Sequence, residues 1–480
     1  MSFDQAVNDA VKPVADAALG VIFWPVPLGA GAEMPLIVAW LMAGVLFCTF
    51  YFKFVNFRYF AQGMRLLRGK ADEPGAPGNI TYYQALASCL SATVGLGNIA
   101  GVAVGLSAGG PGAAVWLCLM GFLGMSAKFA EGTLAVKYRK LLPNGEYVGG
   151  PVEYLSEGFA AKGGKWTKFG LVLSFIFAIC CIGGALGGGN MFQANQTYKQ
   201  FLEITGGDTS WWADKAWLFG LVLSGLVALV IIGGFKSIVA ATSIITPLMA
   251  AIYMVAGAIV IGVNFSHIGD ALHAIFSEAF TPKAGMGAFL GAMVWGVRRA
   301  IFSNEAGLGS AGILHASTKT NYPAAAGMVA MLGAFFDTVV ICMMTALVLV
   351  FSGVLPADRT SDIAGVELTS RAFAQVLPWF PYVLAVCVFL FAYSTIITWF
   401  YYGLTSARYL FGSSRAVDIS FKVVTLVCVV LGTSLQLGTI LDLGDAMFFI
   451  MAVPNLIGVY VLAPVVMQEF KKYEQVIKKQ

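Results

Sequence analysis

Eleven long apolar stretches, joined mostly by short polar loops, follow one another along this chain of 480 residues. A helix needs about 20 mainly apolar residues to cross the hydrocarbon core of a bilayer. Only 11% of the residues are charged, against roughly 25% in soluble domains, which excludes an ordinary soluble enzyme. The pattern predicts an all-α polytopic membrane protein with about 11 transmembrane helices. The predicted spans cover residues 34–52, 84–106, 112–136, 169–200, 216–234, 238–262, 286–312, 325–352, 380–404, 420–436 and 444–466.

The loops fall into two sets that differ in positive charge. One set, which includes the C-terminal tail, carries 20 of the 29 Lys and Arg residues. Because these residues are enriched in cytoplasmic loops, we expect the N-terminus outside and the C-terminus in the cytoplasm, in a plasma (inner) membrane. Two outer loops, 263–285 and 353–379, are long enough for short surface helices. The outer set carries only Lys12, Lys199, Lys215, Lys283, Arg359 and Arg371.

We expect three regions along the chain. Residues 1–33 form an extracytoplasmic amphipathic segment, residues 34–466 a single transmembrane domain, and residues 467–480 a cytoplasmic tail. Within residues 4–22, apolar side chains recur at helical spacing between charged ones, which is typical of a helix lying in the membrane interface. A simple leader tail is the alternative for that segment.

The second predicted span contains Gly95, Gly97 and Asn98 close together. Glycine inside a helix costs about 1 kcal/mol relative to alanine, so this cluster predicts a place where the helix unwinds. Unwound backbone at membrane depth is tolerated where it lines a cavity, and its freed carbonyls and N–H groups can bind a cation and a carboxylate. Gly97, Gly101 and Gly105 also form a small-residue stripe that suits plain helix packing.

The seventh span is interrupted in a similar way, between Trp295 and Ser310. Arg298, Arg299 and Glu305 near mid-membrane are costly unless they pair or face a cavity. A structural Arg–Glu ion pair and a functional role are both open for the arginines. Asn304 and Glu305 lie at the interruption itself, which favours a functional role for them.

The two interruptions lie five spans apart, so they would occupy matching places in two inverted halves. Glycine-interrupted segments in corresponding positions are the best sequence indication of a transporter binding site. The string that contains Gly95 and Gly97 also fits a dinucleotide fingerprint, but no strand precedes it, as that motif requires.

Further polar residues could complete such a site. Gln193 lies one turn from Asn190 on one face of the fourth span. Ser394 and Thr395 are adjacent hydroxyls in an apolar run, and hard cations prefer oxygen ligands; hydroxyls in helices also simply bond their own backbone. Asp337 is a cation ligand or a paired structural charge. Lys128 and Glu131, one turn apart, are interpreted as a structural pair.

Several strings resemble the signature of the alanine or glycine:cation symporter family. They occur in the expected order from the second span to the ninth. One departure is Val115 before Trp116, where the family usually has Phe-Trp; it lies away from the expected site. The strings are residues 97–102, 109–116, 189–194, 302–307 and 337–338.

The resemblance implies a LeuT-like fold of five plus five inverted spans with one extra N-terminal span. It also implies site residues. Thr93, Gly97 and Asn98 would face the substrate, with Phe302 and Trp399 as apolar walls. Beyond the resemblance, we expect the substrate ammonium to be met by carbonyls and by Gln193, Asn304 or Glu305. The carbonyls of Ser91, Val94 and Phe391 and the hydroxyls of Ser394 and Thr395 would hold one sodium ion. Glu305 and Asp337 remain candidate coupling or structural charges.

We therefore expect a secondary transporter and not an enzyme. Its expected function is sodium-coupled symport of a small neutral amino acid, alanine or glycine, into the cytoplasm by alternating access. It would need no cofactor beyond the co-transported sodium ion, and the net charge of +4 does not indicate a nucleic-acid partner. The alternatives are a proton-coupled symporter of the same fold, with Glu305 or Asp337 as the proton carrier, and an uncoupled channel or uniporter.

Overall fold

The computed structural model is helical apart from two small antiparallel hairpins. It describes residues 3–29, 32–69, 75–280, 286–356 and 365–479. The elements of the first half, in chain order, are α1 Phe3–Ile22, β1 Pro25–Gly29, β2 Ala32–Pro35, α2 Leu36–Tyr51, α3 Val55–Arg58, α4 Phe60–Leu67, α5 Tyr82–Thr93, η1 Gly97–Gly101, α6 Val102–Gly109, α7 Ala113–Lys137, β3 Lys140–Leu141, β4 Tyr147–Val148, α8 Pro151–Ala160, α9 Lys165–Leu186, η2 Gly187–Met191, α10 Phe192–Ile204, η3 Gly207–Thr209 and α11 Ala216–Ile231.

The second half continues as a helical bundle. Short helices again interrupt or join the long ones. In chain order its elements are α12 Gly234–Val263, η4 Phe265–His267, α13 Ile268–Phe280, α14 Met286–Asn304, α15 Ser310–His315, α16 Pro323–Ala334, η6 Phe335–Cys342, α17 Met343–Ser352, α18 Val366–Ala374, α19 Phe380–Phe411, α20 Arg415–Thr433, α21 Leu437–Phe449 and α22 Ala452–Ile477.

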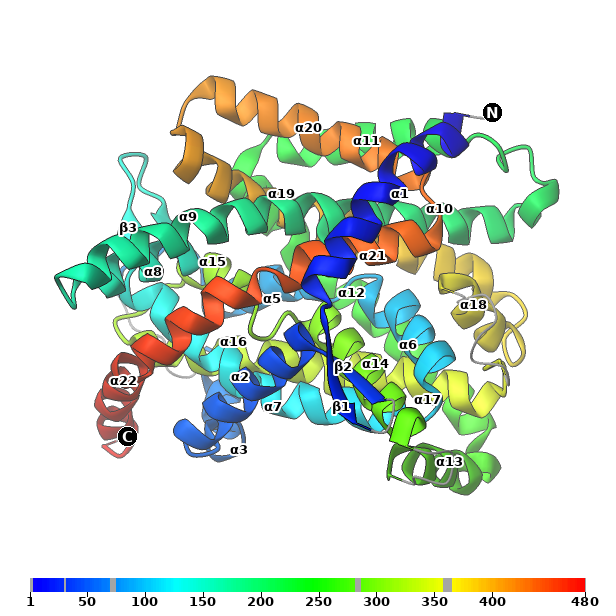
Figure 1. Ribbon diagram of the computed structural model, residues 1–480, viewed down its shortest axis with the longest axis horizontal. Helices are drawn as coiled ribbons and strands as arrows, with labels where there is room; N and C mark the ends of the chain where they lie inside the picture. Colours follow the sequence, from blue (N-terminus) through cyan, green and yellow to red (C-terminus); the bar gives the residue numbers. More distant parts are fainter. Residues whose placement is uncertain (1–2, 30–31, 70–74, 281–285, 357–364, 480) are drawn as a thin grey trace.

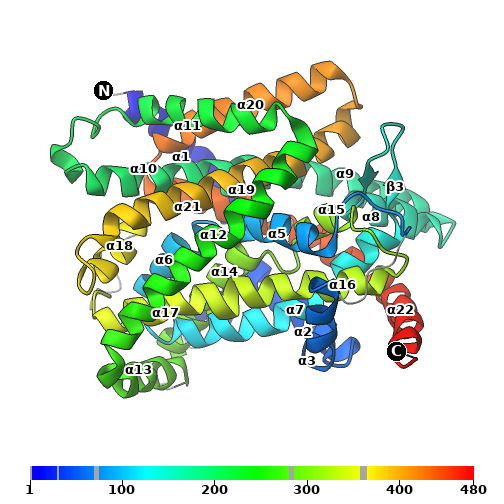
Figure 2. The ribbon, with the colours of Figure 1, turned by 180° about the vertical axis from the view of Figure 1, so that it is seen from behind.

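Long helices run lengthwise through the molecule, and the loops gather at its two ends. Figures 1 and 2 show α13 and α18 at one end, and the β3 hairpin with the C-terminal part of α22 at the other. The first end corresponds to the loops expected outside, and the second to loops expected in the cytoplasm. The two outer loops expected to hold short helices do so, as α13 and α18.

Every predicted span coincides with helix. Among the described residues, seven helical stretches are long and apolar enough to cross a membrane, and a bent pair, α5 with η1 and α6, adds an eighth. Two shorter apolar helices, α2 and α11, occupy the first and fifth predicted spans. These helices establish a multi-pass membrane protein; the count of 11 and the inverted repeat stay predictions.

The N-terminal segment forms a helix, as its periodicity predicts. Figure 1 shows α1 crossing the face of the bundle beside α21. The Asn8 side-chain oxygen accepts the Gln436 N–H at the start of α21, at 3.1 Å. Farther along, the rings of Phe23 and Phe449 lie 5.4 Å apart. This helix is therefore packed on the bundle, and its place in the membrane interface stays a prediction.

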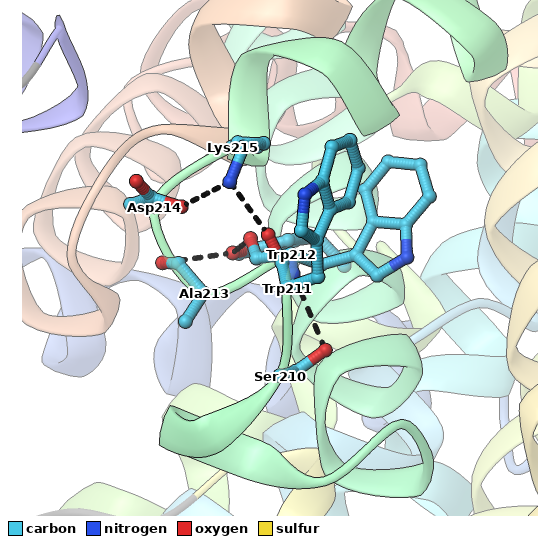
Figure 3. Close-up of polar contacts among 7 residues, drawn as sticks. Ser210, Trp211, Trp212, Ala213, Asp214 and Lys215 are labelled. Carbon is cyan, nitrogen blue, oxygen red and sulfur yellow. Dashed lines mark hydrogen bonds and ion pairs between the residues drawn. The ribbon is translucent and has the colours of Figure 1, made fainter.

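The loop between α10 and α11 is tied together by its own polar contacts (Figure 3). The Lys215 ammonium donates to the Trp211 carbonyl and to Asp214, each at 2.8 Å. It also lies 4.3 Å from the centre of the Trp211 ring. Tryptophan is enriched where membrane helices meet the headgroups, and 62% of Trp211 is exposed here.

Candidate functional site

The first predicted interruption is a real break in the helix. The axis bends by 54° between α5 and the segment formed by η1 and α6. The Asn98 side-chain oxygen accepts the Gly95 N–H at 2.9 Å, so the amide replaces a helical hydrogen bond at the break. A Cβ at Gly95 would crowd Thr395 and Gln193. A residue without a side chain is therefore needed there.

Gln193 joins this break to a second irregular helix. Its side-chain oxygen accepts the Leu96 N–H at 2.9 Å, and its NH₂ group donates to the Gly188 carbonyl at 2.9 Å. Gly188 belongs to η2, a π-helical turn. Such turns are rare overall, but those that occur often lie at functional sites. Asn190, on the same element, bonds the Thr425 carbonyl of α20 instead.

Asp337 organises a buried polar network beside the first break. Asn98 donates to Asp337 Oδ1 at 2.7 Å, and the Ser303 and Thr338 hydroxyls donate to Oδ2 at 2.8 Å. Asn304 donates in turn to the Thr338 hydroxyl at 3.0 Å. Asp337 lies in η6, which is π-helical like η1 and η2. The network thus connects the first break, the end of α14 and η6.

The second predicted interruption is also a break, between α14 and α15. Glu305 has a φ of 58°, and Gly307 and Gly309 have a φ of 87°, a region that glycine adopts readily and other residues rarely. Asn304 caps the break, because its side-chain oxygen accepts the Ala306 N–H at 2.9 Å. The Glu305 carboxylate accepts the Ser310 hydroxyl and the Trp399 indole N–H, the latter at 3.1 Å.

Glu131 supports this second break from α7. Its Oε1 accepts the Gly309 N–H at 3.1 Å and the Asn455 NH₂ group at 2.9 Å. Asn455 also donates to the Gly307 carbonyl at 2.8 Å. The expected structural pair of Lys128 with Glu131 is wrong as a direct contact, because the Lys128 ammonium has no hydrogen-bond partner among the described residues.

The oxygen set implied for sodium lies where α5 ends against α19. The Thr395 hydroxyl donates to the Ser91 carbonyl at 2.9 Å, and the Ser394 hydroxyl to the Phe391 carbonyl at 3.1 Å. Val94 follows directly at the end of α5. All five residues are buried. The Thr395–Ser91 contact joins the two helices, whereas the Ser394–Phe391 contact lies within α19. No acidic side chain belongs to the set.

Aromatic rings cluster beside the two breaks. The Phe302 ring lies 5.1 Å from Phe192 and 5.0 Å from Phe448, and the Trp399 ring stacks on Phe448 at 4.6 Å. A Cβ at Gly97 would lie 3.3 Å from Phe302, and a Cβ at Gly189 would overlap Trp399. Glycines thus let two backbones approach two bulky rings closely.

The arginines of α14 do not pair with Glu305, which corrects the Arg–Glu alternative. Both guanidinium groups instead contact Asp445 of α21; the Arg298 contact measures 2.7 Å. Arg298 also lies 4.3 Å from the Phe23 ring. Asp445 follows Asp442 by three residues in an apolar run, and that pattern does not indicate its role, since only the fold brings α21 to α14.

Thr93 is the site prediction with the weakest geometric support. Its hydroxyl bonds carbonyls of its own helix, Cys89 and Leu90, each at 3.4 Å. The residues that sequence analysis missed are Asp445, Glu131 as a support of the second break, Asn455 and Phe448. The three-glycine run of residues 187–189 is the signal that could have indicated η2.

A family model described as "Sodium:alanine symporter family" matches residues 29–480. The chain belongs to that family. The sodium/alanine symporter AgcS of Methanococcus maripaludis is 37% identical over 447 residues, covering 92% of this chain and 95% of the relative. The probable sodium/glutamine symporter GlnT of Bacillus subtilis is 31% identical over 442 residues, covering 91% and 87%.

Among solved structures, MhsT in complex with L-phenylalanine aligns with a TM-score of 0.54 at 16% identity, covering 82% of this chain and 99% of that chain. At this identity the likeness shows the fold alone, which is LeuT-like, as the resemblance implied. Membership of the sodium:alanine symporter family makes the chain a membrane transporter and not an enzyme.

Proposed function

We propose that this sodium:alanine symporter family member carries a small neutral amino acid, alanine or glycine, into the cytoplasm together with sodium by alternating access. The observation that carries the proposal is that two broken helices meet in one buried polar network. Asn98 at the first break and Ser303 just before the second both donate to Asp337, and Gln193 and Trp399 bond the two breaks from neighbouring helices. Broken helices that meet at mid-membrane form the binding sites of secondary transporters.

Sodium would bind between α5 and α19. The Ser91 and Phe391 carbonyls now accept hydrogen bonds from the Thr395 and Ser394 hydroxyls. A hard cation between them would turn those hydroxyl protons away and draw all four oxygens to itself. The ion would thereby hold the end of α5 next to the break that receives the substrate. Coupling of the two affinities is then reciprocal, as linkage requires.

The substrate would lie beside Gly97 and Asn98. Its carboxylate would approach the N–H groups of the helix that starts at the break, where the dipole favours negative charge. Its ammonium would be met by carbonyls and polar side chains, with Asn304 and Glu305 the nearest candidates at the second break. The rings of Phe302 and Trp399 favour a small side chain, because glycine backbones lie close against them.

The ion site is tested by replacing Ser394 and Thr395 with alanine together. We expect the sodium concentration for half-maximal uptake to rise at least about ten-fold, equivalent to roughly 1.4 kcal/mol of lost ion binding. Thr405→Ala is the matched control, because its hydroxyl also bonds a carbonyl of α19, that of Tyr401, away from the site. Unchanged sodium dependence in the double variant would remove this assignment.

A proton-coupled symporter of the same fold is the second candidate. The observation that favours it is the burial of Glu305 and Asp337, each bonded to hydroxyl groups. Glu305→Gln and Asp337→Asn separate the two candidates. Under a sodium gradient at fixed pH, sodium coupling predicts accumulation that needs no proton gradient; proton coupling predicts accumulation driven by the proton gradient alone, which either substitution removes.

A further inference from the structure

A cavity of about 300 Å³ opens where three parts of the chain meet, and none of the residues that line it belongs to either break. It lies between the α11–α12 turn, the α19–α20 turn and the β3–β4 hairpin, which Figure 2 shows gathered at one end of the molecule. These loops belong to the set rich in Lys and Arg. Its volume is at the lower end of the range for small-molecule sites.

The charges that line this cavity do not cancel. Arg408 and Asp418 neutralise each other in a two-pronged ion pair, with contacts of 2.8 and 2.7 Å. Lys236 and Lys422 line the same cavity, and neither makes an ion pair within the described part of the chain. Glu146 is the remaining charged residue of the lining. The lining therefore has a net charge of +1, and two of its ammonium groups have no ion-pair partner within the described part of the chain.

The rest of the lining is apolar and continues onto the outer surface of the bundle. Phe400 and Leu404 form a buried wall, and the rings of Phe235 and Tyr401 meet at 5.0 Å. Ile232, at the rim, is 69% exposed. An isoleucine so exposed at the end of a membrane helix faces lipid. The cavity thus combines cationic groups with an apolar exit toward the bilayer.

We propose that this cavity binds the phosphate headgroup of an anionic phospholipid from the cytoplasmic leaflet. Lys236 and Lys422 contact the phosphate, and an acyl chain leaves past Ile232 along α11. Basic pockets between membrane helices on the cytoplasmic side recognise such headgroups. A phosphodiester with one negative charge matches the net charge of the lining. The apolar exit favours a lipid over a free phosphate ion, because only the lipid has an acyl chain that can lie along it.

Binding of a lipid here would bridge the two turns that precede α12 and α20. The proposal depends on the proposed function only through the orientation that places these loops in the cytoplasm. The test is therefore made without sodium or amino acid, so that its result is independent of transport.

The experiment measures binding of phosphatidylglycerol to the purified full chain in detergent by native mass spectrometry. The variant is Lys236→Gln with Lys422→Gln. The control is Lys162→Gln with Lys168→Gln, which removes the same charge from exposed lysines of the same loop set. At about 1 kcal/mol per lysine, the variant should bind roughly 30-fold more weakly, and the control like the unmodified chain. Phosphatidylcholine should show no such difference.

A third variant, which should bind the lipid more tightly, shows whether weaker binding by the double variant reflects misfolding. Glu146→Gln removes the negative charge of the lining and should tighten phosphatidylglycerol binding roughly five-fold. Equal affinity of the unmodified chain and both cavity variants would overturn the proposal. So would inorganic phosphate that competes as strongly as the lipid, because the site would then take a free anion.

Discussion

At the scale of single residues, amide side chains do the work of missing helical hydrogen bonds. Asn98 and Asn304 each accept a backbone N–H inside the break that they adjoin, and Gln193 does so across helices. Sequence analysis found these three because each stands close to glycines in an apolar run. Asn455 and Asp445 also have a glycine nearby, but their partners lie more than a hundred residues away, so only the fold reveals their roles.

Loss of the Asp445 carboxylate should destabilise the fold more than loss of the charge of Arg298, one of its two partners. Asp445→Ala leaves the fully buried Arg299 without its counter-charge, which typically costs about 3–5 kcal/mol. Arg298 retains 12% exposure, so Arg298→Gln should cost clearly less. Thermal unfolding in detergent measures both. Equal shifts in Tm for the two variants would contradict the assignment of Asp445 as the counter-ion of a buried guanidinium.

At the scale of elements, the segment before α5 is fastened to the segment after α15. Ile80 and Thr318 form a bridge, and the Asn79 N–H donates to the Ser317 carbonyl at 2.8 Å. Arg139 spans the junction by donating to four carbonyls, at 2.6 to 3.0 Å, two of which are Pro77 and Thr320. The N-terminal end of the first broken helix, which the loop charges predict to be the inner end, is therefore closed by these contacts.

Arg139 should hold this closed arrangement. Arg139→Ala removes four charge-assisted hydrogen bonds, each of the class worth about 1.5–3 kcal/mol, so the inner end should open more than about ten-fold more often. Buried Cys89 of α5 reports this, as the single cysteine in a background without the other seven. We expect its alkylation from the cytoplasmic side to accelerate accordingly. Arg139→Lys should rescue only in part, because an ammonium lacks the planar fork.

An unchanged alkylation rate in Arg139→Ala would show that the junction is held by the backbone contacts alone.

The irregular elements η2 and η6 illustrate why such details escape sequence analysis. Each bonds to a distant helix: Asn190 of η2 donates to the Thr425 carbonyl of α20, and Asn98 donates to the Asp337 carbonyl of η6. Hydrophobic periodicity predicts a helix at both places, but it does not distinguish a π-helical turn from an α-helical one.

At the scale of the whole molecule, the apolar pattern was enough to predict helix at each of the expected spans, since helix length and bilayer thickness are matched. The apolar pattern did not predict how far the helices extend or where they bend. Where it predicted one span over residues 444–466, α21 and α22 together form a 41-residue helical stretch. The ion-pair partners of α14 likewise required the fold. The two breaks, by contrast, were predictable, because buried glycine next to a polar side chain is costly unless the backbone leaves the helix.

The account's central claim is that sodium entering between α5 and α19 drives a small amino acid through the space between the breaks. The most direct measurement is uptake of labelled alanine into proteoliposomes at fixed pH, with and without an inward sodium gradient. The account predicts accumulation above equilibrium that requires the gradient. Equilibration without accumulation, or accumulation that follows a proton gradient in the absence of sodium, would contradict it.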